Sequence, residues 1–255
     1  ATFVAALAIP TMPGIWRMAK LANGTQIRLE QVGDENLHYW RDARGICYNV
    51  DDNGVATPIA NMQAVRAHAA TRMAQNNARR AAAATRTVGI SHKHVGKRKG
   101  LIVLANFTDA HFQPEHTNEL LTRMANEVGF TYKDGHKGSL HDYFKAQSNG
   151  LFDLTFDVVG PVQLKHDMAY YGRDTLDWRG SRTDIRAGTM VAEACKAAIG
   201  KVNFRDYDWD GDGAVDQVLV IFAGYGQASG GNSNTIWPHE WALQYSDYGK
   251  YLPVG

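Results

Sequence analysis

The residues best suited to chemistry in this sequence are the acidic side chains of one short stretch, residues 206–216. Aspartates occupy every second position from Asp206 to Asp212, and Asp216 follows shortly after Gly213. Carboxylates this close together repel one another unless a cation lies among them. Hard divalent cations take six to eight oxygen ligands, and an Asp-x-Asp-x-Asp-Gly loop supplies carboxylates from alternate residues while the glycine permits the turn. The spacing therefore predicts a metal-binding loop.

Ligands that are all oxygens favour calcium over zinc. We expect a structural calcium ion held by Asp208, Asp210, Asp212, the carbonyl oxygen of Ala214, and Asp216. An EF-hand would have a glutamate at the twelfth loop position, where Leu219 stands, so no flanking helix pair is expected. Two alternatives stay open at this point: a register that begins at Asp206 and leaves Asp216 out, and a solvated acidic turn without an ion.

Histidines offer no comparable motif. A helical His-Glu-x-x-His would place two imidazoles on one face to bind zinc, with the glutamate as general base. The nearest match begins at His239-Glu240, but Leu243 stands where the second histidine is needed. His92 and His94 lie in a basic stretch with no further ligand, and His239 is expected to pack or to form a hydrogen bond. The residues alone therefore predict no catalytic group.

The elements that must position the acidic loop follow from hydropathy patterns. Residues 1–60 predict a small β-rich module, with strands at 26–29, 37–40 and 46–50 separated by glycine-containing turns. Residues 61–96 are rich in alanine and arginine and predict an exposed helical, basic connector.

Residues 97–255 predict a larger domain in which strands alternate with helices. Strands are expected at 101–107, at 151–159 with an end at Gly160-Pro161, and at 217–223 directly after the acidic loop. Helices are expected at 118–128, at 139–149 with Ser139 as the N-cap, and from an Asp184 cap to Ile199. The chain as a whole is predicted to be α+β, with a mixed sheet and helices in the larger domain.

Composition narrows the possible partners and the location. The formal charge of +1 gives no reason to expect nucleic acid, and no apolar run reaches the 18 or more residues that a membrane span needs. The two cysteines, Cys47 and Cys195, exclude a disulfide framework, and Cys195 is expected to be buried and inert. The apolar start, residues 1–10, is compatible with what remains around a removed signal peptide.

The order of several motifs resembles M6-family secreted metallopeptidases, the immune inhibitor A group. The resemblance is carried by the acidic loop with the stretches 218–226, 228–230 and 235–239, and by 139–150, 156–161 and 168–172. Earlier residues are similar to the propeptide of that family: Gly24, Gly33-Asp34-Glu35, His38-Tyr39, Gly45 and Asp52-Asn53-Gly54.

The resemblance implies a bacterial, secreted, zinc-dependent endopeptidase made as a zymogen, which acts on protein or peptide substrates. It implies that residues 97–255 are the N-terminal part of a zincin-like peptidase domain and that the zinc ligands lie beyond Gly255, so the chain alone is expected to be inactive. The propeptide would act as an intramolecular inhibitor, and a thiolate or carboxylate can block a catalytic zinc. By residue type, Cys47 is the first candidate for this role, followed by Asp34 and Glu35; a structural half-buried cysteine is the alternative.

Two other functions stay open. One is a non-catalytic, calcium-stabilised binding module that has lost the zinc helix. The other is a prodomain-like inhibitor that acts on a separate peptidase.

Overall fold

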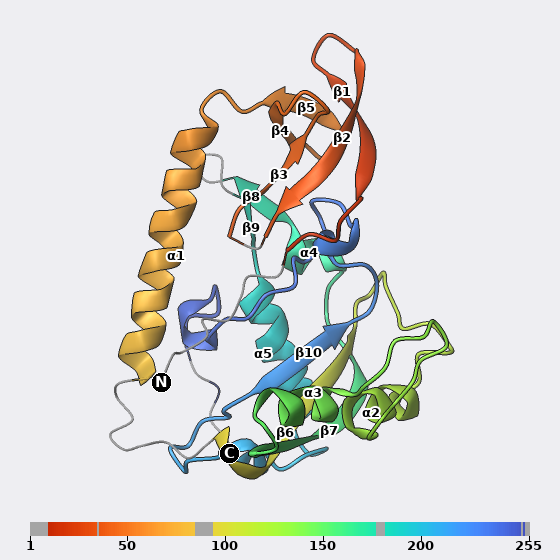
Figure 1. The fold of residues 1–255 in the computed structure, drawn as a ribbon, viewed down its shortest axis with the longest axis vertical. Coiled ribbons are helices and arrows are strands. Elements are labelled where there is room, and N and C mark those ends of the chain that lie inside the picture. Colours follow the sequence, from red (N-terminus) through yellow and green to blue (C-terminus); the bar gives the residue numbers. More distant parts are fainter. Residues whose placement is uncertain (1–9, 35, 85–93, 177–181, 251, 253–255) are drawn as a thin grey trace. The chain divides into compact units, whose positions relative to one another are not determined.

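The computed structural model describes residues 10–34, 36–84, 94–176, 182–250 and 252, and the chain divides into two compact units (Figure 1). The first unit comprises residues 1–86, 168–187 and 225–247. The second comprises residues 87–167, 188–224 and 248–255. Both helices and strands are present, as the predicted α+β class requires. The proposed limits at residues 60 and 96 stay predictions.

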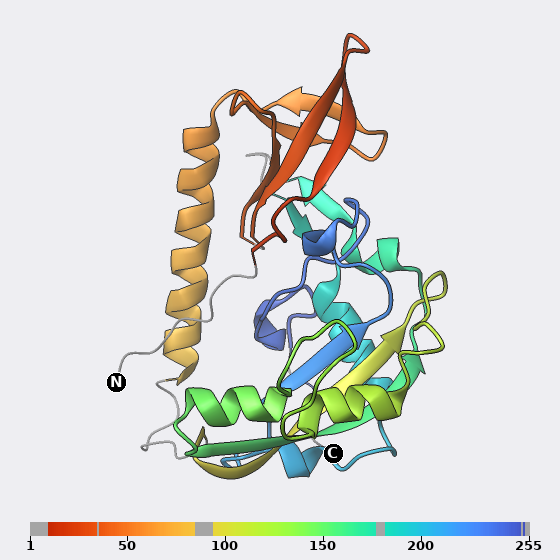
Figure 2. The ribbon, with the colours of Figure 1, turned by 45° about the vertical axis from the view of Figure 1, so that its right-hand side comes forward.

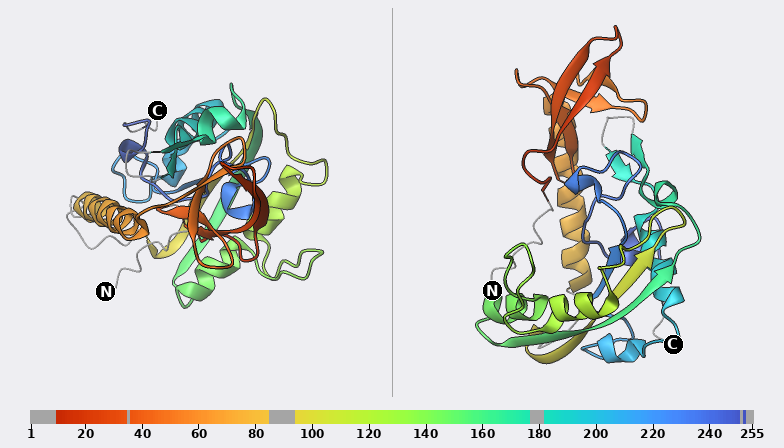
Figure 3. Two further views of the ribbon diagram at one scale, coloured as in Figure 1. Left: turned by 90° about the horizontal axis from the view of Figure 1, so that it is seen from above. Right: turned by 90° about the vertical axis from the view of Figure 1, so that its right-hand side faces the viewer.

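The first unit contains a closed barrel, whose strands form a ring when seen from above (Figure 3, left). Its strands are β1 (Trp16–Leu21), β2 (Gln26–Gly33), β3 (His38–Arg41), β4 (Cys47–Val50) and β5 (Val55–Pro58). Neighbours are antiparallel, and the parallel pairing of β1 with β5 closes the ring. The barrel core is formed by Ala19, Leu29, Tyr48, Val50 and Ala56. Strands β2, β3 and β4 were predicted, whereas β1 and β5 were not.

Helix α1 (Met62–Ala84) follows the barrel and corresponds to the predicted connector helix. Its apolar side is narrow, because Val65 and Ala69 are buried while Met73 is exposed. Arg66 donates a hydrogen bond to the hydroxyl of Tyr39 in β3. The remaining elements of this unit are short: α4 (Met168–Gly172), β8 (Asp174–Leu176), β9 (Arg182–Asp184), η3 (Gln227–Ser229) and η4 (Leu243–Tyr245).

The second unit is built on a three-stranded sheet in the order β10-β6-β7, and both of its described pairings are parallel, whereas a mixed sheet was predicted. Strand β6 (Gly96–Asn106) is central, between β10 (Val218–Phe222) and β7 (Phe152–Gln163). The run Leu101–Ala105 of β6 is fully buried, as expected for a strand covered on both faces. Helices α2 (Asn118–Asn126) and α3 (Leu140–Gln147) lie side by side against β7 (Figure 2). Helix α5 (Ala187–Ala197) and the short η2 (Phe204–Tyr207) complete the unit.

Capping and turn residues in the sequence predicted some ends of helices and strands correctly and others wrongly. Ser139 caps α3 in a complete capping box with Asp142, which confirms the predicted N-cap. Strand β7, however, continues to Gln163, because its ladder with β6 resumes after a register shift, with Ala105 opposite Val162. The predicted cap at Asp184 is also wrong: this residue ends β9, and α5 begins at Ala187.

Among the described residues, no helix is both long enough and apolar enough to cross a membrane.

Candidate metal centre

The acidic loop begins at the end of η2 and is anchored to the sheet by two aromatic residues. Tyr207 is buried, and its hydroxyl donates to Oδ2 of Asp157 in β7 at 2.9 Å. The indole N–H of Trp209 donates to the carbonyl oxygen of Lys99 in β6 at 2.7 Å. Burial and the bond to Asp157 raise the pKa of the Tyr207 phenol, so the hydroxyl stays a donor at neutral pH. The start of the loop is therefore held on both β6 and β7.

The far end of the loop folds back onto its start. The N–H of Asp216 donates to the Tyr207 carbonyl at 3.0 Å, and Oδ2 of Asp216 accepts the N–H of Trp209 at 2.5 Å. Strand β10 starts at Val218, two positions later. The carboxylate of Asp216 is thus brought back beside residues 208–210 and is directly connected to the last strand of the sheet.

Asp208, Asp210 and Asp216 converge on one point. One carboxylate oxygen from each of the three lies within 4.8 Å of the other two. Calcium–oxygen distances are 2.3–2.6 Å, so two ligands of the same ion can be at most about 5 Å apart. The spacing of these oxygens therefore fits one calcium ion. Asp210 is exposed, and Asp208 and Asp216 are half-buried, so an ion here would keep part of its water shell.

The loop backbone is arranged around the same carboxylates. Asp208 accepts the N–H groups of Gly211, Asp212 and Gly213 at 2.7, 3.1 and 2.9 Å. Gly211 and Gly213 have φ of 77° and 86°, a backbone conformation that residues with a Cβ rarely adopt. The tight turn after Asp210 explains why glycines stand at these two positions.

The other predicted ligands are placed differently. Oδ1 of Asp212 accepts the N–H of Ala214 at 2.9 Å, and Asp212 does not belong to the converging group. Asp212 and the Ala214 carbonyl stay predicted ligands. Asp206, which would begin the alternative register, lies in η2 and accepts a hydrogen bond from the Asn203 side chain. The geometry thus favours the register that starts at Asp208.

A catalytic zinc ion does not fit the described residues. Among them, the three aspartates are the one group of three or more metal-ligand atoms in reach of a common ion, and this group contains no imidazole and no thiolate. Nδ1 of His239 lies 2.6 Å from the Trp237 carbonyl oxygen, as expected for a hydrogen-bonding histidine. The ring of His94 packs edge-on against Phe152 and Trp209, and His92 is outside the described residues. No catalytic step can be assigned to these side chains.

The candidates for a zymogen switch have local contacts in the barrel unit. The thiol of Cys47, which is partly exposed in β4, is 3.7 Å from the carbonyl oxygen of Gly45. Oδ1 of Asp34 accepts the N–H groups of Asn36 and Leu37 and so stabilises the turn between β2 and β3. Glu35 lies outside the described residues. Cys195 is buried as predicted, and burial raises the pKa of its thiol to about 11.

Sequence reasoning did not find the anchors of the loop, Tyr207, Trp209 and Asp157. A usable signal was present, because two large aromatic residues, Tyr207 and Trp209, alternate with the aspartates from Asp206 to Asp210, and such side chains are often buried. The partner on β7 was not predictable in this way, since its pairing depends on the arrangement of the sheet.

Comparisons with known proteins agree with this part of the chain. Residues 87–251 match the family model described as "Immune inhibitor A peptidase M6, catalytic domain". The chain is 24% identical over 170 residues to the "Immune inhibitor A" of Bacillus thuringiensis subsp. alesti. That alignment covers 60% of this chain but 24% of the relative, so the chain spans about a quarter of the length of the curated protein that it matches.

Proposed function

Because the chain belongs to the immune inhibitor A peptidase family, M6, we propose that it is the front portion of a secreted zinc-dependent endopeptidase. Peptidases of this family are generally zinc-dependent and act on proteins, and the reaction would be hydrolysis of peptide bonds. The observation that carries the proposal is the match of residues 87–251 to the catalytic-domain model. In the proposed enzyme, the second unit would be the N-terminal part of a zincin-like peptidase domain. A bacterial, extracellular protein fits the Bacillus source of the relative.

The zinc ligands would come from outside these 255 residues, because the sequence contains no His-Glu-x-x-His. The barrel of β1 to β5 would be the propeptide of a zymogen, which inhibits the peptidase intramolecularly. In support, all five strands lie before residue 87, outside the part that matches the catalytic domain.

The acidic loop would bind a structural calcium ion through Asp208, Asp210, Asp212, Ala214 and Asp216. The ion would neutralise the converging carboxylates and fix the segment between η2 and β10. Because Tyr207 and Trp209 already connect this segment to β7 and β6, calcium would stabilise the sheet of the second unit.

The test compares the 255-residue chain with the product of the complete reading frame in a fluorescent casein assay. We expect cleavage by the complete, processed product, inhibition by the zinc chelator 1,10-phenanthroline, and no cleavage by the 255 residues alone. A complete product that stays inactive after processing, or cleavage that is insensitive to the chelator, would contradict the peptidase proposal.

A calcium-stabilised binding module is the second candidate function. It is favoured by one observation: the ligand atoms that converge in the described residues are all carboxylate oxygens, as calcium prefers. This function predicts that calcium raises the melting temperature while the complete product cleaves no protein. The casein assay therefore separates the two candidates.

A further inference from the structure

Two aspartates face each other on the short hairpin of β8 and β9 in the first unit. Asp174 and Asp184 are register partners in this antiparallel pair, so their side chains project from the same face of the hairpin. Their side chains are only 2% and 4% exposed. Like charges directly opposite one another destabilise a strand pair, and burial adds the cost of desolvation. Both carboxyl groups cannot readily be ionised together.

The contacts assign a proton to Asp184. Its Oδ2 accepts the N–H of Trp237 at 3.0 Å, whereas its Oδ1 is buried without a hydrogen-bond partner among the described residues. The His239 ring is 3.8 Å away, and its Nδ1 donates to the Trp237 carbonyl instead. Burial raises the pKa of Asp184 well above its usual range, and repulsion from Asp174 and Asp247 adds to this. The bond from the Trp237 N–H opposes the shift only in part.

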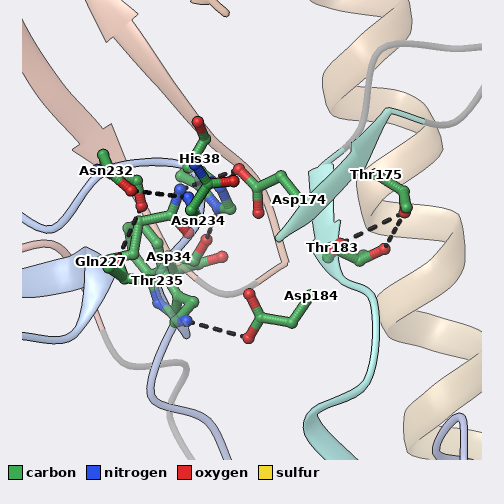
Figure 4. A network of polar contacts seen from close by, with 12 residues as sticks. Asp34, His38, Asp174, Thr175, Thr183, Asp184, Gln227, Asn232, Asn234 and Thr235 are labelled. Atoms are coloured by element: carbon green, nitrogen blue, oxygen red, sulfur yellow. Dashed lines mark hydrogen bonds and ion pairs between the residues drawn. The ribbon is translucent and has the colours of Figure 1, made fainter. Parts of the chain in front are cut away.

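Asp174 contacts a histidine of the barrel, and Asp184 bonds to the residue that stacks on this histidine; Figure 4 shows His38, Asp174 and Asp184. Oδ2 of Asp174 accepts a hydrogen bond from the Gln227 amide at 2.9 Å and lies 3.5 Å from Nε2 of His38 in β3. Asp184 reaches His38 through Trp237. The Trp237 ring stacks on the His38 ring with centroids 4.2 Å apart and planes 15° from parallel. Asp174 therefore contacts His38 directly, and Asp184 holds the backbone of Trp237, whose ring stacks on His38.

Which ring nitrogen of His38 carries a hydrogen decides which of its neighbours it can donate to. Nδ1 lies 3.3 Å from the carbonyl oxygen of Asp34, which can only accept, so Nδ1 carries a hydrogen. Nε2 then attracts the Asp174 carboxylate only when it is protonated as well. Further charged groups near this cluster, in the part of the chain that the structure describes, include Arg17, which lines a small cavity with His38 and lies over the Trp40 ring, and Asp52, which is bonded to Ser233.

We propose that His38 and the Asp174–Asp184 pair form a pH-sensitive clasp between the barrel and the segments 168–187 and 225–247. The clasp is closed in acid, when Asp184 is neutral and only one of the two paired carboxyl groups carries a charge. It weakens as pH rises, because ionisation of Asp184 places two anions opposite each other. If the barrel is a propeptide, as proposed above, the clasp makes its retention dependent on pH. The clasp itself does not require that function.

The sign follows from proton linkage. The closed state holds a proton on Asp184 that an open, solvated state releases above the ordinary carboxyl pKa of about 4. Between that value and the raised pKa, the equilibrium constant for opening grows by up to about tenfold per pH unit.

Hydrogen exchange on the full chain measures this opening. Protection factors of the Asp174 and Trp237 amides, corrected for the intrinsic effect of pH, are compared between about pH 5 and pH 8. These amides donate to the Ser233 carbonyl and to Asp184, respectively. In the wild type, we expect opening to increase at least tenfold over this range, with a much smaller change in β7 of the second unit.

The decisive variant is Asp184→Asn, which keeps an acceptor for the Trp237 amide but cannot ionise. We expect its opening to change at least tenfold less with pH than that of the wild type. The matched control is Glu30→Gln, which removes an acid from an exposed pair with Arg41 in the same barrel and should keep the wild-type pH dependence. The proposal would be overturned if opening of the Asp184→Asn variant depended on pH as strongly as opening of the control. It would also be overturned if the amides of β7 showed the same increase in opening with pH as the Asp174 and Trp237 amides.

A second measurement decides the case if Asp184→Asn does not fold. The infrared spectrum of the wild-type chain in D2O near neutral pH should contain the carbonyl band of a protonated carboxylic acid. Absence of that band would show that the pair holds no proton, and the clasp would be refuted.

Discussion

Replacing Asp210 with asparagine should change stability in opposite directions with and without calcium. Asp210 is the exposed member of the converging group, whereas the bonds that anchor the loop at its start and its end involve Tyr207 and Asp216. Without calcium, the charge of Asp210 repels Asp208 and Asp216, and its Oδ1 accepts the N–H of Asp212 at 3.3 Å, a bond that an asparagine oxygen can also accept. With calcium, the same charge becomes a ligand. The variant Asp210→Asn should therefore be more stable than the wild type in EDTA and should gain less stability from calcium.

The structure sets the size of both effects. At the 4.8 Å limit that bounds the separations, two unit charges repel by about 0.9 kcal/mol in water and about 3.5 kcal/mol at an effective dielectric constant of about 20. The exposure of Asp210 favours the lower value. Calcium at about one hundred times its Kd stabilises the folded chain by about 2.7 kcal/mol, or about 5–11 °C in Tm for a protein of this size. A tenfold loss of affinity in the variant would remove about 1.4 kcal/mol of that gain, or about 3–6 °C.

Thermal melting in EDTA and in excess calcium, followed by tryptophan fluorescence, gives the four values needed. Asp206→Asn is the matched control, since it removes the same charge from a neighbouring residue outside the converging group. It should keep the wild-type gain from calcium. Equal calcium gains in wild type and Asp210→Asn would refute the reasoning, and a loss of the gain in both Asp210→Asn and Asp206→Asn would favour the other register.

Three further predictions concern the residues around this loop and the helices of the second unit. Tyr207→Phe, which removes the bond to Asp157, should lower the free energy of unfolding by about 1 kcal/mol in chemical denaturation, whereas Tyr143→Phe, at an exposed side chain, should change it little. Hydrogen bonds from the backbone N–H groups of Ser139 and Gly129 lower the pKa of Asp142, so its contribution is present at neutral pH and lost as pH falls through that lowered pKa. Asp142→Asn should therefore melt below the wild type at neutral pH, and the difference should disappear as pH falls through the lowered pKa of Asp142; a constant difference would count against the capping role. The buried thiol of Cys195, with its pKa of about 11, should resist alkylation of the native chain near pH 8, while Cys47 should react. Mass spectrometry of the digested protein measures the labelling of both cysteines. Equal labelling would contradict the burial of Cys195.

Local chemistry made much of the fold predictable. The unbroken apolar run in β6 predicted a strand covered on both faces, and Ser139 with Asp142 predicted the start of α3. Strand β1 was missed because Met18 and Trp16 are exposed, so the apolar alternation does not mark one buried face. Strand β7 passes through a cis Gly160-Pro161 bond, whose isomer is decided by tertiary contacts and not by the two residues alone.

The metal loop could be predicted because its ligands are close together in the sequence. Asp208, Asp210 and Asp216 lie within nine consecutive positions, so spacing alone restricts their geometry. The clasp could not be predicted in this way, because His38, Asp174 and Trp237 come from three distant segments. Asp184 even carried a misleading local signal, since aspartate before a helix is typical of an N-cap. Its true role depends on the strand opposite and on the Trp237 amide.

Calorimetric titration of the chelator-treated chain with calcium tests the central claim most directly. If Asp208, Asp210 and Asp216 gather around one ion, the wild type should bind one calcium per chain in this loop. Asp206→Asn should bind with the same stoichiometry and similar affinity, and Asp210→Asn should bind at least about tenfold more weakly. A wild-type chain that binds no calcium, or an Asp210→Asn variant that binds it as tightly as the wild type, would contradict the assignment.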